Sequence, residues 1–249
     1  MKLEKIIKEL MLTRKHQGSS VGELNEKTRV DWIEQTLKKL PKGNTILDAG
    51  AGEQPYKKLC KHLNYISQDF AEYNPDNLNE GLQMEKWDYG KLDIISDITS
   101  IPVENNSFDA VLCTEVFEHI INPIGAINEF SRILRKNGYL IITAPFCSLT
   151  HFAPYHFYSG FNKYFYESEL DKNGFNIIEL IPNGNYFEYL AQEINRLSHM
   201  SQKYCDKRIN KTEFDSIAQI KKLLHNLSKK DTGSSELLCF GYHILAQKK

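Results

Sequence analysis

The chain has 249 residues, of which 41% are hydrophobic, and its formal net charge is −1 at pH 7. A chain of this length can bury a sizeable core in one large domain, or in one domain with an insertion. The near-neutral charge disfavours a nucleic-acid-binding protein that relies on bulk positive charge, so no nucleic-acid partner is expected.

The five cysteines are scattered and have no C-x-x-C spacing. They therefore predict neither a zinc-binding framework nor a disulfide scaffold, and they are typical of small buried side chains in a reducing compartment. The first residues are charged throughout, unlike a signal peptide, and no apolar run reaches the roughly 20 residues that span a bilayer. We expect a cytoplasmic protein without a membrane span.

Helical and strand-like patterns follow one another along the chain. Apolar residues recur at helical spacing through residues 1–40, and the same spacing returns over 183–233. Strands are predicted over 45–47, 64–67, 92–96, 108–113, 139–143, 175–181 and 237–246, and helices over 55–62, 124–134 and 164–174. A polar loop is predicted over residues 71–91.

The alternation of apolar strands with helices predicts an α/β fold, with a parallel sheet covered by helices on both faces. The strand at the end of the chain indicates that the sheet is completed after a helical insertion. Residues 41–182 and 234–249 form the predicted sheet domain, and 1–40 are N-terminal helices. Residues 183–233 are the insertion, which we expect to cap the site or to form the face of a homodimer.

The first predicted strand runs into a glycine turn. Its apolar residues are followed by Asp48, and Gly50 and Gly52 stand one residue apart. Such turns bind nucleotide-like cofactors in α/β sheets, although a lone Gly-x-Gly is also compatible with a purely structural turn. Pro55 occupies the position of the third glycine of a nicotinamide-binding turn. A carboxylate at Asp48 suits a cofactor with a cationic group better than an anionic pyrophosphate.

Polar residues end the later strands as well. Asp69 ends the second strand, about 20 residues beyond the turn, where a carboxylate can accept hydrogen bonds from ribose hydroxyls. A cap of the following segment would explain Asp69 equally well. Asp97 follows the third strand, and the stretch from Phe108 to His119 brings polar groups to the end of the fourth. Ligands bind at these carboxyl ends in open α/β sheets.

Five stretches of the chain resemble those of class I S-adenosylmethionine-dependent methyltransferases. They are Ile46-Leu-Asp-Ala-Gly-Ala-Gly52, Asp97-Ile-Thr-Ser-Ile-Pro102, Ser107-Phe-Asp-Ala-Val-Leu112, Glu115-Val-Phe-Glu-His119 and Arg132-Ile-Leu-Arg-Lys-Asn-Gly-Tyr-Leu140. The resemblance implies a Rossmann-like fold with a mostly parallel seven-stranded sheet, an antiparallel last strand, helices on both faces and a helical cap. It also implies that S-adenosylmethionine is the cofactor.

The resemblance assigns cofactor contacts along the carboxyl edge of the sheet. Glycines let the backbone approach the methionine part closely, and carboxylates can bind the ribose hydroxyls and the adenine amino group. From the methionine end to the adenine end, the expected contacts are Asp48, Gly50, Ala51, Gly52, Asp69, Phe70, Asp97 and Ile98, with Thr114 and Glu115 beneath the cofactor.

Methyl transfer to an alcohol requires a general base, and histidine titrates near neutral pH. His119 follows the fourth strand, while His151 and His156 lie in a loop rich in His and Tyr after the fifth. These three are the predicted catalytic residues, although a backbone hydrogen bond would explain His119, and loop packing the other two. No metal site is predicted: Glu118 and the loop histidines are candidate ligands, but no histidine pair has helical ligand spacing.

The predicted acceptor is a small molecule with a hydroxyl group. The Gly-x-Gly-x-x-Pro-Tyr form of the turn is similar to methyltransferases of sugar and surface-polysaccharide biosynthesis, so a sugar or sugar nucleotide is expected first. The stretch from Glu115 to His119 is similar to quinone-pathway enzymes, which makes a quinone or other aromatic acceptor an alternative, as is N-methylation of an amino sugar. A catalytically silent, cofactor-binding partner subunit is the alternative of another class.

Overall fold

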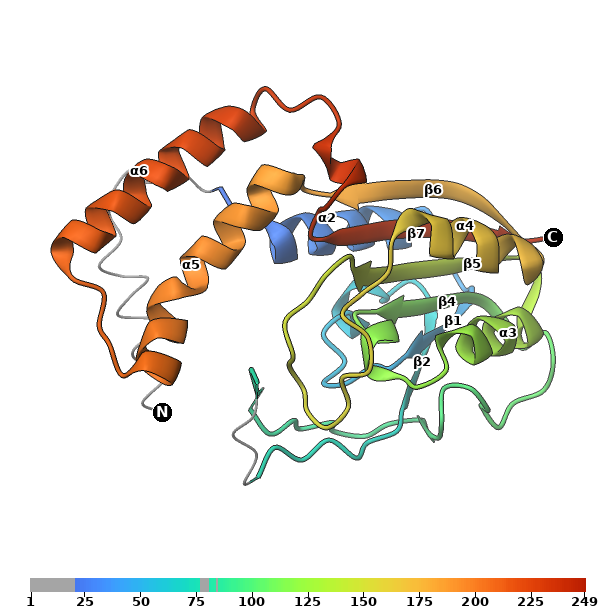
Figure 1. Ribbon diagram of the computed structural model, residues 1–249. Helices are drawn as coiled ribbons and strands as arrows, with labels where there is room; N and C mark the ends of the chain where they lie inside the picture. The colour runs from blue at the N-terminus through green and yellow to red at the C-terminus, as the bar shows by residue number, and fades with distance from the viewer. Residues whose placement is uncertain (1–20, 77–80, 84) are drawn as a thin grey trace. The chain divides into compact units, whose positions relative to one another are not determined.

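The computed structural model describes residues 21–76, 81–83 and 85–249 (Figure 1). The chain divides into two compact units: a sheet unit of Asn25–Gly184 and Ser235–Lys249, and a helical unit of Asn185–Ser234 with the described residues before Asn25. Residues 25–40, which the sequence grouped with the N-terminal helices, cluster with the sheet. The helix predicted near the N-terminus lies outside the described residues.

A seven-stranded sheet forms the centre of the sheet unit (Figure 1). Its strands are β1 (Thr45–Ala49), β2 (Asn64–Asp69), β3 (Ile94–Ile95), β4 (Phe108–Thr114), β5 (Leu134–Pro145), β6 (Phe175–Asn183) and β7 (Gly241–Lys248). They pair in the order β3-β2-β1-β4-β5-β7-β6, with β1 to β5 parallel and β7 antiparallel to both of its neighbours. The predicted Rossmann-like α/β fold is confirmed.

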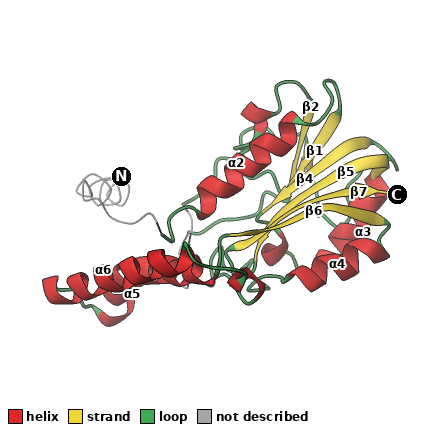
Figure 2. Cartoon of the chain, turned by 90° about the horizontal axis from the view of Figure 1, so that it is seen from above, coloured by secondary structure: helices red, strands yellow, loops and turns green. Residues whose placement is uncertain are grey.

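Helices cover both faces of this sheet (Figure 2). On one face, α2 (Asn25–Lys38) buries Ile33 and Leu37, which lie four residues apart on one side of the helix. On the other face, α3 (Pro123–Ile133) and α4 (Lys163–Lys172) bury Phe130 and Tyr166. The apolar strands are therefore buried on both sides, and the loops at their carboxyl ends remain to form a site.

The segments around β2 and β3 are less regular than predicted. The helix expected over 55–62 is a single 3₁₀ turn, Lys57–Leu59, and the third strand is reduced to Ile94–Ile95. Gln54 adopts a φ of +57°, and β2 begins at Asn64, so too few residues remain to offset the cost of nucleating an α-helix. β3 lies at the edge of the sheet and pairs with β2 alone.

The connection between α3 and β5 also differs from the sequence pattern, in which Lys136-Asn-Gly138 is typical of a glycine cap that closes the helix predicted over 124–134. The helix ends at Ile133, and β5 begins at Leu134, which already pairs with Phe108 of β4. Asn137, rather than the glycine, adopts the left-handed region, with a φ of +63°. Pairing with β4 thus replaces the expected glycine cap.

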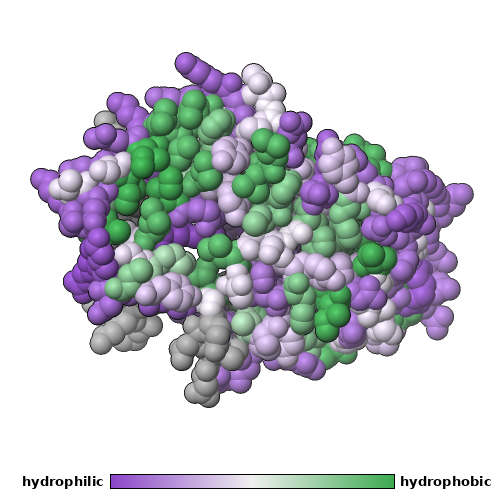
Figure 3. All heavy atoms as spheres, viewed as in Figure 1, coloured by the Kyte–Doolittle hydropathy of each residue, from purple (hydrophilic) through white to green (hydrophobic). Residues whose placement is uncertain are grey.

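The helical unit contains α5 (Tyr186–Cys205) and α6 (Lys211–Ser228). Asn210 caps α6 in a capping box with Glu213, and Ala191 packs with Leu224 in a small core. Apolar residues gather over this unit in Figure 3. The large exposed ones are Leu24, Leu197, Tyr204, Phe214, Ile220, Leu223 and Leu227. In the described part of the chain, no helix is long and apolar enough to cross a membrane.

The start of α3 gives a test of the fold. Asn122 caps the helix by accepting a hydrogen bond from the Gly125 N–H at 2.9 Å. Asn122→Ala should therefore lower the free energy of unfolding by about 1 kcal/mol in urea titrations. Asn128→Ala, at an exposed position of the same helix, is the matched control and should not destabilise the protein. Equal effects of the two substitutions would contradict the assigned cap.

Candidate functional site

The glycine turn after β1 forms a tight backbone cradle. Gly50 and Gly52 adopt φ values of +76° and +50°, which favour glycine. The N–H groups of Gly50 and Ala51 donate to the Gln68 carbonyl at 2.9 Å, and the Gly52 N–H donates to Asp69 Oδ2 at 2.8 Å. The predicted residues of the turn are therefore held together by the end of β2.

Neighbouring side chains leave no room for a Cβ on either glycine. A Cβ on Gly50 would lie 2.5 Å from a methyl group of Val116, and a Cβ on Gly52 would lie 2.6 Å from the Trp87 ring. The sequence of the turn is thus constrained both by its backbone conformation and by the side chains that close over it.

Asp48 is buried at the end of β1, with 1% of its surface exposed. Its Oδ2 accepts a hydrogen bond of 2.6 Å from the Tyr65 hydroxyl. Burial raises the pKa of Asp48 to about 7, a shift that the Tyr65 hydrogen bond opposes and the nearby Asp69 charge increases. A cationic group bound near this carboxyl would favour its ionised form.

Asp69 shapes the chain on both sides of it. Its Oδ2 holds the Gly52 N–H, and its Oδ1 accepts a 2.9 Å hydrogen bond from the Ala71 N–H. Asp69 is 2% exposed, and burial raises its pKa. Asp69 therefore caps the following segment, the alternative considered from sequence.

The residues expected at the adenine lie beyond β2 and β3. Phe70 makes an edge-on contact with Tyr155, with ring centroids 5.0 Å apart. Asp97 is exposed, and its Oδ1 accepts hydrogen bonds from the N–H and the hydroxyl of Thr99. Ile98 is buried in the core. Contacts of these residues with the cofactor stay a prediction.

A half-buried arginine joins α2 to the end of β4. Arg29 forms an ion pair of 3.0 Å with Glu115, and its side chain is 17% exposed. The Tyr56 hydroxyl is hydrogen-bonded to the side chains of Arg29 and Thr114. The Nε of Arg29 is buried and has no hydrogen-bond partner in the described part of the chain. A ligand could accept a hydrogen bond from this buried N–H group.

The sequence interpretation missed Arg29, although a signal was present. Arg29, Ile33 and Leu37 lie four residues apart, and Ile33 and Leu37 are buried. An arginine on the apolar side of an amphipathic helix is unusual, because charged side chains are rarely buried unless they are paired.

The three predicted histidines lie together. The ring centroids of His119 and His151 are 4.7 Å apart, and those of His151 and His156 are 4.9 Å apart. The ring centroids of His119 and His156 are 6.0 Å apart. The Nε2 of His156 is 3.1 Å from the Ser148 hydroxyl. The cluster lies where the segment after β4 meets the loop after β5.

Glu118 lies among these rings and is 1% exposed. Its Oε1 is 3.6 Å from His119 Nε2 and 4.0 Å from His151 Nε2. Burial, and secondarily the charge of Glu115, raises the pKa of Glu118 well above its usual range. Burial, with the charge of His151, lowers the pKa of His119 to about 3. The sequence named Glu118 only as a weak metal-ligand candidate, and the structure makes it the centre of the cluster.

An aromatic wall connects the histidines with the glycine turn. Trp87, which faces Gly52, lies 4.9 Å from the Phe152 ring, and Phe152 lies 4.8 Å from the His119 ring. Tyr73 stacks on Phe152 at 3.7 Å. The turn and the histidine cluster are therefore parts of one site.

Non-glycine residues in the left-handed region surround this site. Those that flank it are Gln54, Ala71, Glu115 and Phe152, with φ between +53° and +58°. Such conformations are costly and persist where the surrounding structure imposes them, most often at functional sites.

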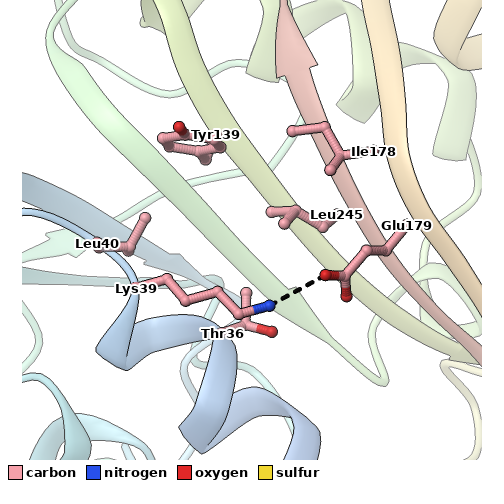
Figure 4. Close-up of a pocket in the computed structure, with 7 residues that line it drawn as sticks. All are labelled: Thr36, Lys39, Leu40, Tyr139, Ile178, Glu179 and Leu245. Carbon is pink, nitrogen blue, oxygen red and sulfur yellow. Dashed lines mark hydrogen bonds and ion pairs between the residues drawn. The ribbon is translucent and has the colours of Figure 1, made fainter.

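A cavity of about 200 Å³ lies elsewhere, between α2 and the strands β5, β6 and β7 (Figure 4). The Lys39–Glu179 ion pair spans it at 3.0 Å, and Tyr139 and Leu245 line it. Neither Asp48 nor any of the clustered histidines lines this cavity. We therefore take the carboxyl edge of the sheet as the candidate site.

Residues 47–142 match the model of a protein family described as a methyltransferase domain. An uncharacterised protein of Methanocaldococcus jannaschii is 34% identical over 97 residues, which are 39% of this chain and 39% of that protein. A ubiquinone biosynthesis O-methyltransferase of Dechloromonas aromatica is 28% identical over 120 residues, 46% of this chain and 49% of the relative. The matches thus span less than half the length of these curated relatives.

Among solved structures, a SAM-dependent methyltransferase from Archaeoglobus fulgidus has the same fold, with a TM-score of 0.54. The superposition covers 96% of this chain and 99% of that chain at 16% identity, so the likeness concerns the fold alone. The family match runs from β1 into β5 and includes both the glycine turn and the segment that carries Glu118 and His119. Over residues 47–142 the chain therefore resembles a methyltransferase domain, and its sheet has the fold of class I methyltransferases.

Proposed function

We propose that this protein transfers a methyl group from S-adenosylmethionine to a hydroxyl oxygen of a small molecule. The observation that carries this proposal is the cluster of three histidines around the buried Glu118, connected to the glycine turn through Trp87 and Phe152. Proton-accepting groups beside a methyl donor are what O-methylation requires.

The residues around the turn suit the methionine end of the cofactor. The ammonium and sulfonium groups are cationic, and Asp48 is a buried carboxyl whose pKa is raised to about 7. The carboxylate of the cofactor is anionic, and the buried Arg29 Nε is a donor that could bind it. Asp69, Phe70, Asp97 and Ile98 are assigned to the ribose and the adenine.

The methyl group of S-adenosylmethionine is bound to a cationic sulfur and is already activated. The acceptor oxygen forms a bond to the methyl carbon while the carbon–sulfur bond breaks, and the sulfur keeps the bonding electrons. Alignment of the two reactants can lower the barrier by about 7 to 11 kcal/mol at best. The hydroxyl proton must pass to a base in the same step or before it.

His156 is the best placed of the three candidate bases. His119 and His151 turn their Nε2 atoms toward Glu118, whereas the Nε2 of His156 is hydrogen-bonded to the Ser148 hydroxyl. In this assignment, His119 and His151 position the acceptor rather than accept its proton.

The acceptor is a sugar or a sugar nucleotide of surface-polysaccharide biosynthesis. The form of the glycine turn favours it, and so do the aromatic residues of the loop after β5, where Phe157 and Tyr158 are 43% and 38% exposed. Exposed aromatic rings can stack on a sugar ring. The second candidate is a quinone-like aromatic acceptor, favoured by the wall of Tyr73, Trp87 and Phe152 and by the Dechloromonas relative.

A panel of acceptors tests the proposal directly. The full chain is incubated with S-adenosylmethionine and with sugar nucleotides, catechols or amino sugars, and S-adenosylhomocysteine is quantified. We expect turnover with a hydroxyl acceptor and a methyl ether as the product. Turnover with the amino sugar alone would indicate N-methylation. Cofactor binding without turnover on any acceptor would favour the silent subunit.

The glycine turn predicts the effect of a single methyl group. Gly50→Ala should weaken S-adenosylmethionine binding by at least about tenfold in calorimetry, because the new Cβ displaces Val116 and strains the backbone. Gly43→Ala is the matched control: its φ is +86°, but nothing lies within 4 Å of the added Cβ. If both variants bind the cofactor alike, the turn is not the binding site.

Ionisation of Asp48 should couple cofactor binding to pH. Its pKa is raised to about 7, so a cationic ligand that prefers the carboxylate should bind more tightly as the pH rises from about 6 to 8. Asp48→Asn should bind more weakly and lose this rise. The same slope in both proteins would remove Asp48 from the binding site.

Without the cofactor, Asp48 should influence stability in the opposite sense. The folded pKa of about 7 exceeds the unfolded value of 3.8, so its stabilising contribution is complete below about pH 4 and is lost as the pH rises through 7. Urea unfolding of the wild type and of Asp48→Asn between pH 4 and 8 measures this difference.

The assignment of the base predicts a change in turnover rather than in binding. His156→Ala should lower turnover by about 100-fold or more and leave the dissociation constant of S-adenosylmethionine unchanged. His199→Ala, an exposed histidine of α5, serves as the control and should keep wild-type turnover. Wild-type turnover in His156→Ala would exclude His156 as the base.

A further inference from the structure

Glu118, His119 and His151 present three potential ligand atoms to one point. One atom from each residue lies within 4.8 Å of the other two. Glu118 Oε1 is 3.6 Å from His119 Nε2 and 4.0 Å from His151 Nε2. Around an ion bound at about 2.1 Å, neighbouring ligand atoms are about 3 to 3.5 Å apart. The first contact would need to shorten by a few tenths of an ångström and the second by about 0.5 to 1 Å, which side-chain rotations can supply.

Backbone carbonyls orient both imidazoles toward this point. His119 Nδ1 is 2.6 Å from the Tyr155 carbonyl, and His151 Nδ1 is 2.8 Å from the Leu149 carbonyl. A ring nitrogen that faces a carbonyl carries the proton and donates it, so each Nε2 is left with a free lone pair. The same hydrogen bond fixes the orientation and tautomer of metal-binding histidines.

Among the described residues, no lysine or arginine forms an ion pair with Glu118. Its Oε2 is buried and has no hydrogen-bond partner in the described part of the chain. The nearby Glu115 is of the same sign and is already paired with Arg29. A buried ionised carboxylate is costly unless a cation or several donors compensate for the lost water. A divalent cation would supply that compensation.

The backbone around Glu118 is held in place. Its carbonyl accepts hydrogen bonds from the N–H groups of Phe157 at 2.9 Å and Tyr158 at 3.2 Å. A β-bridge between Leu82 and His151 joins the loop to a further segment, with hydrogen bonds from the Leu82 N–H to the Thr150 carbonyl and from the Phe152 N–H to the Leu82 carbonyl. The three ligand atoms, which come from two segments about 30 residues apart, are thus brought together by a supported framework rather than by a flexible loop tip.

We propose that Glu118, His119 and His151 bind a divalent transition-metal ion, which in turn binds and activates the hydroxyl group of the acceptor. Two imidazoles and one carboxylate suit Zn²⁺, Co²⁺, Mn²⁺ or Fe²⁺ better than Mg²⁺, which prefers oxygen ligands. Three protein ligands leave further positions open, as in catalytic rather than structural sites.

The role of the ion rests on the methyl transfer proposed above. A metal-bound hydroxyl is more acidic than a free one, so its proton can pass to His156 or to water at neutral pH. The resulting oxygen forms the bond to the methyl carbon as the carbon–sulfur bond breaks. No redox change of the ion is involved, and the proton and the methyl group are the only groups transferred.

Direct metal binding tests the site without reference to turnover. The full chain is stripped with a chelator and titrated with Co²⁺, and binding is followed by visible absorption and calorimetry. We expect one ion per chain. E118Q, H119A and H151A should each weaken Co²⁺ binding by at least about tenfold. E118Q should fold at least as well as the metal-free wild type, since it removes a buried acid, and circular dichroism checks this.

His62 provides a matched control for the loss of an imidazole. Its Nε2 also bonds a backbone carbonyl, that of Leu37 at 3.1 Å, but it precedes β2 at the opposite edge of the sheet. H62A should bind Co²⁺ like the wild type. A wild type that binds no Co²⁺, or variants of Glu118, His119 and His151 that bind it unchanged, would overturn the proposal.

Two further outcomes separate the metal site from the methyl transfer. Co²⁺ binding that depends on Glu118 in a protein without turnover on any acceptor would support the site and contradict the proposed function. Undiminished methyl transfer by the chelated, metal-free protein would overturn the activating role of the ion, while the proposed function would stand.

Discussion

The pairing of β1 with β4 determines where the site lies. The two strands are parallel neighbours, with Ile46 opposite Ala110 and Asp48 opposite Leu112. The order of strands reverses between them, and at such a point the loops at the carboxyl ends diverge and leave a crevice. The glycine turn after β1 and the segment after β4 therefore lie side by side, with Val116 against Gly50. The remaining strands and helices hold these two ends in register.

Burial of charge is the second constraint, and it follows from the first. Asp48, Asp69 and Glu118 are each exposed by 2% or less, and all lie at or just beyond the carboxyl ends of strands. Asp69 is compensated by backbone N–H groups. Asp48 and Glu118 have raised pKa values because burial opposes their ionisation. A cationic cofactor beside Asp48 and a divalent ion beside Glu118 would each relieve such a buried acid.

The sequence predicted the parts of this architecture that depend on local pattern. Apolar runs gave the strands, and the positive φ values of Gly50 and Gly52 agree with the predicted turn. The short 3₁₀ turn at Lys57–Leu59 was mistaken for a helix, because its limits are set by the turn before it and by β2 after it rather than by its own residues.

The site was only partly predictable, for a similar reason. His119, His151 and His156 could be chosen as residue types after strands. Their grouping around Glu118 depends on the fold of the loop after β5, whose carbonyls orient the rings of His119 and His151. The place of Arg29 beside Glu115 depends on the packing of α2 against the sheet. Contacts between segments far apart in the chain are not encoded in the spacing of either segment.

A crystal structure of the full chain grown with S-adenosylhomocysteine and Mn²⁺ would test the account most directly. We expect the nucleoside product to lie along the carboxyl edge with its amino acid part at the Gly50–Gly52 turn, and an anomalous scattering peak within about 2.3 Å of Glu118, His119 and His151. A product bound away from the turn would contradict the central claim that this edge of the sheet is a methyl-transfer site.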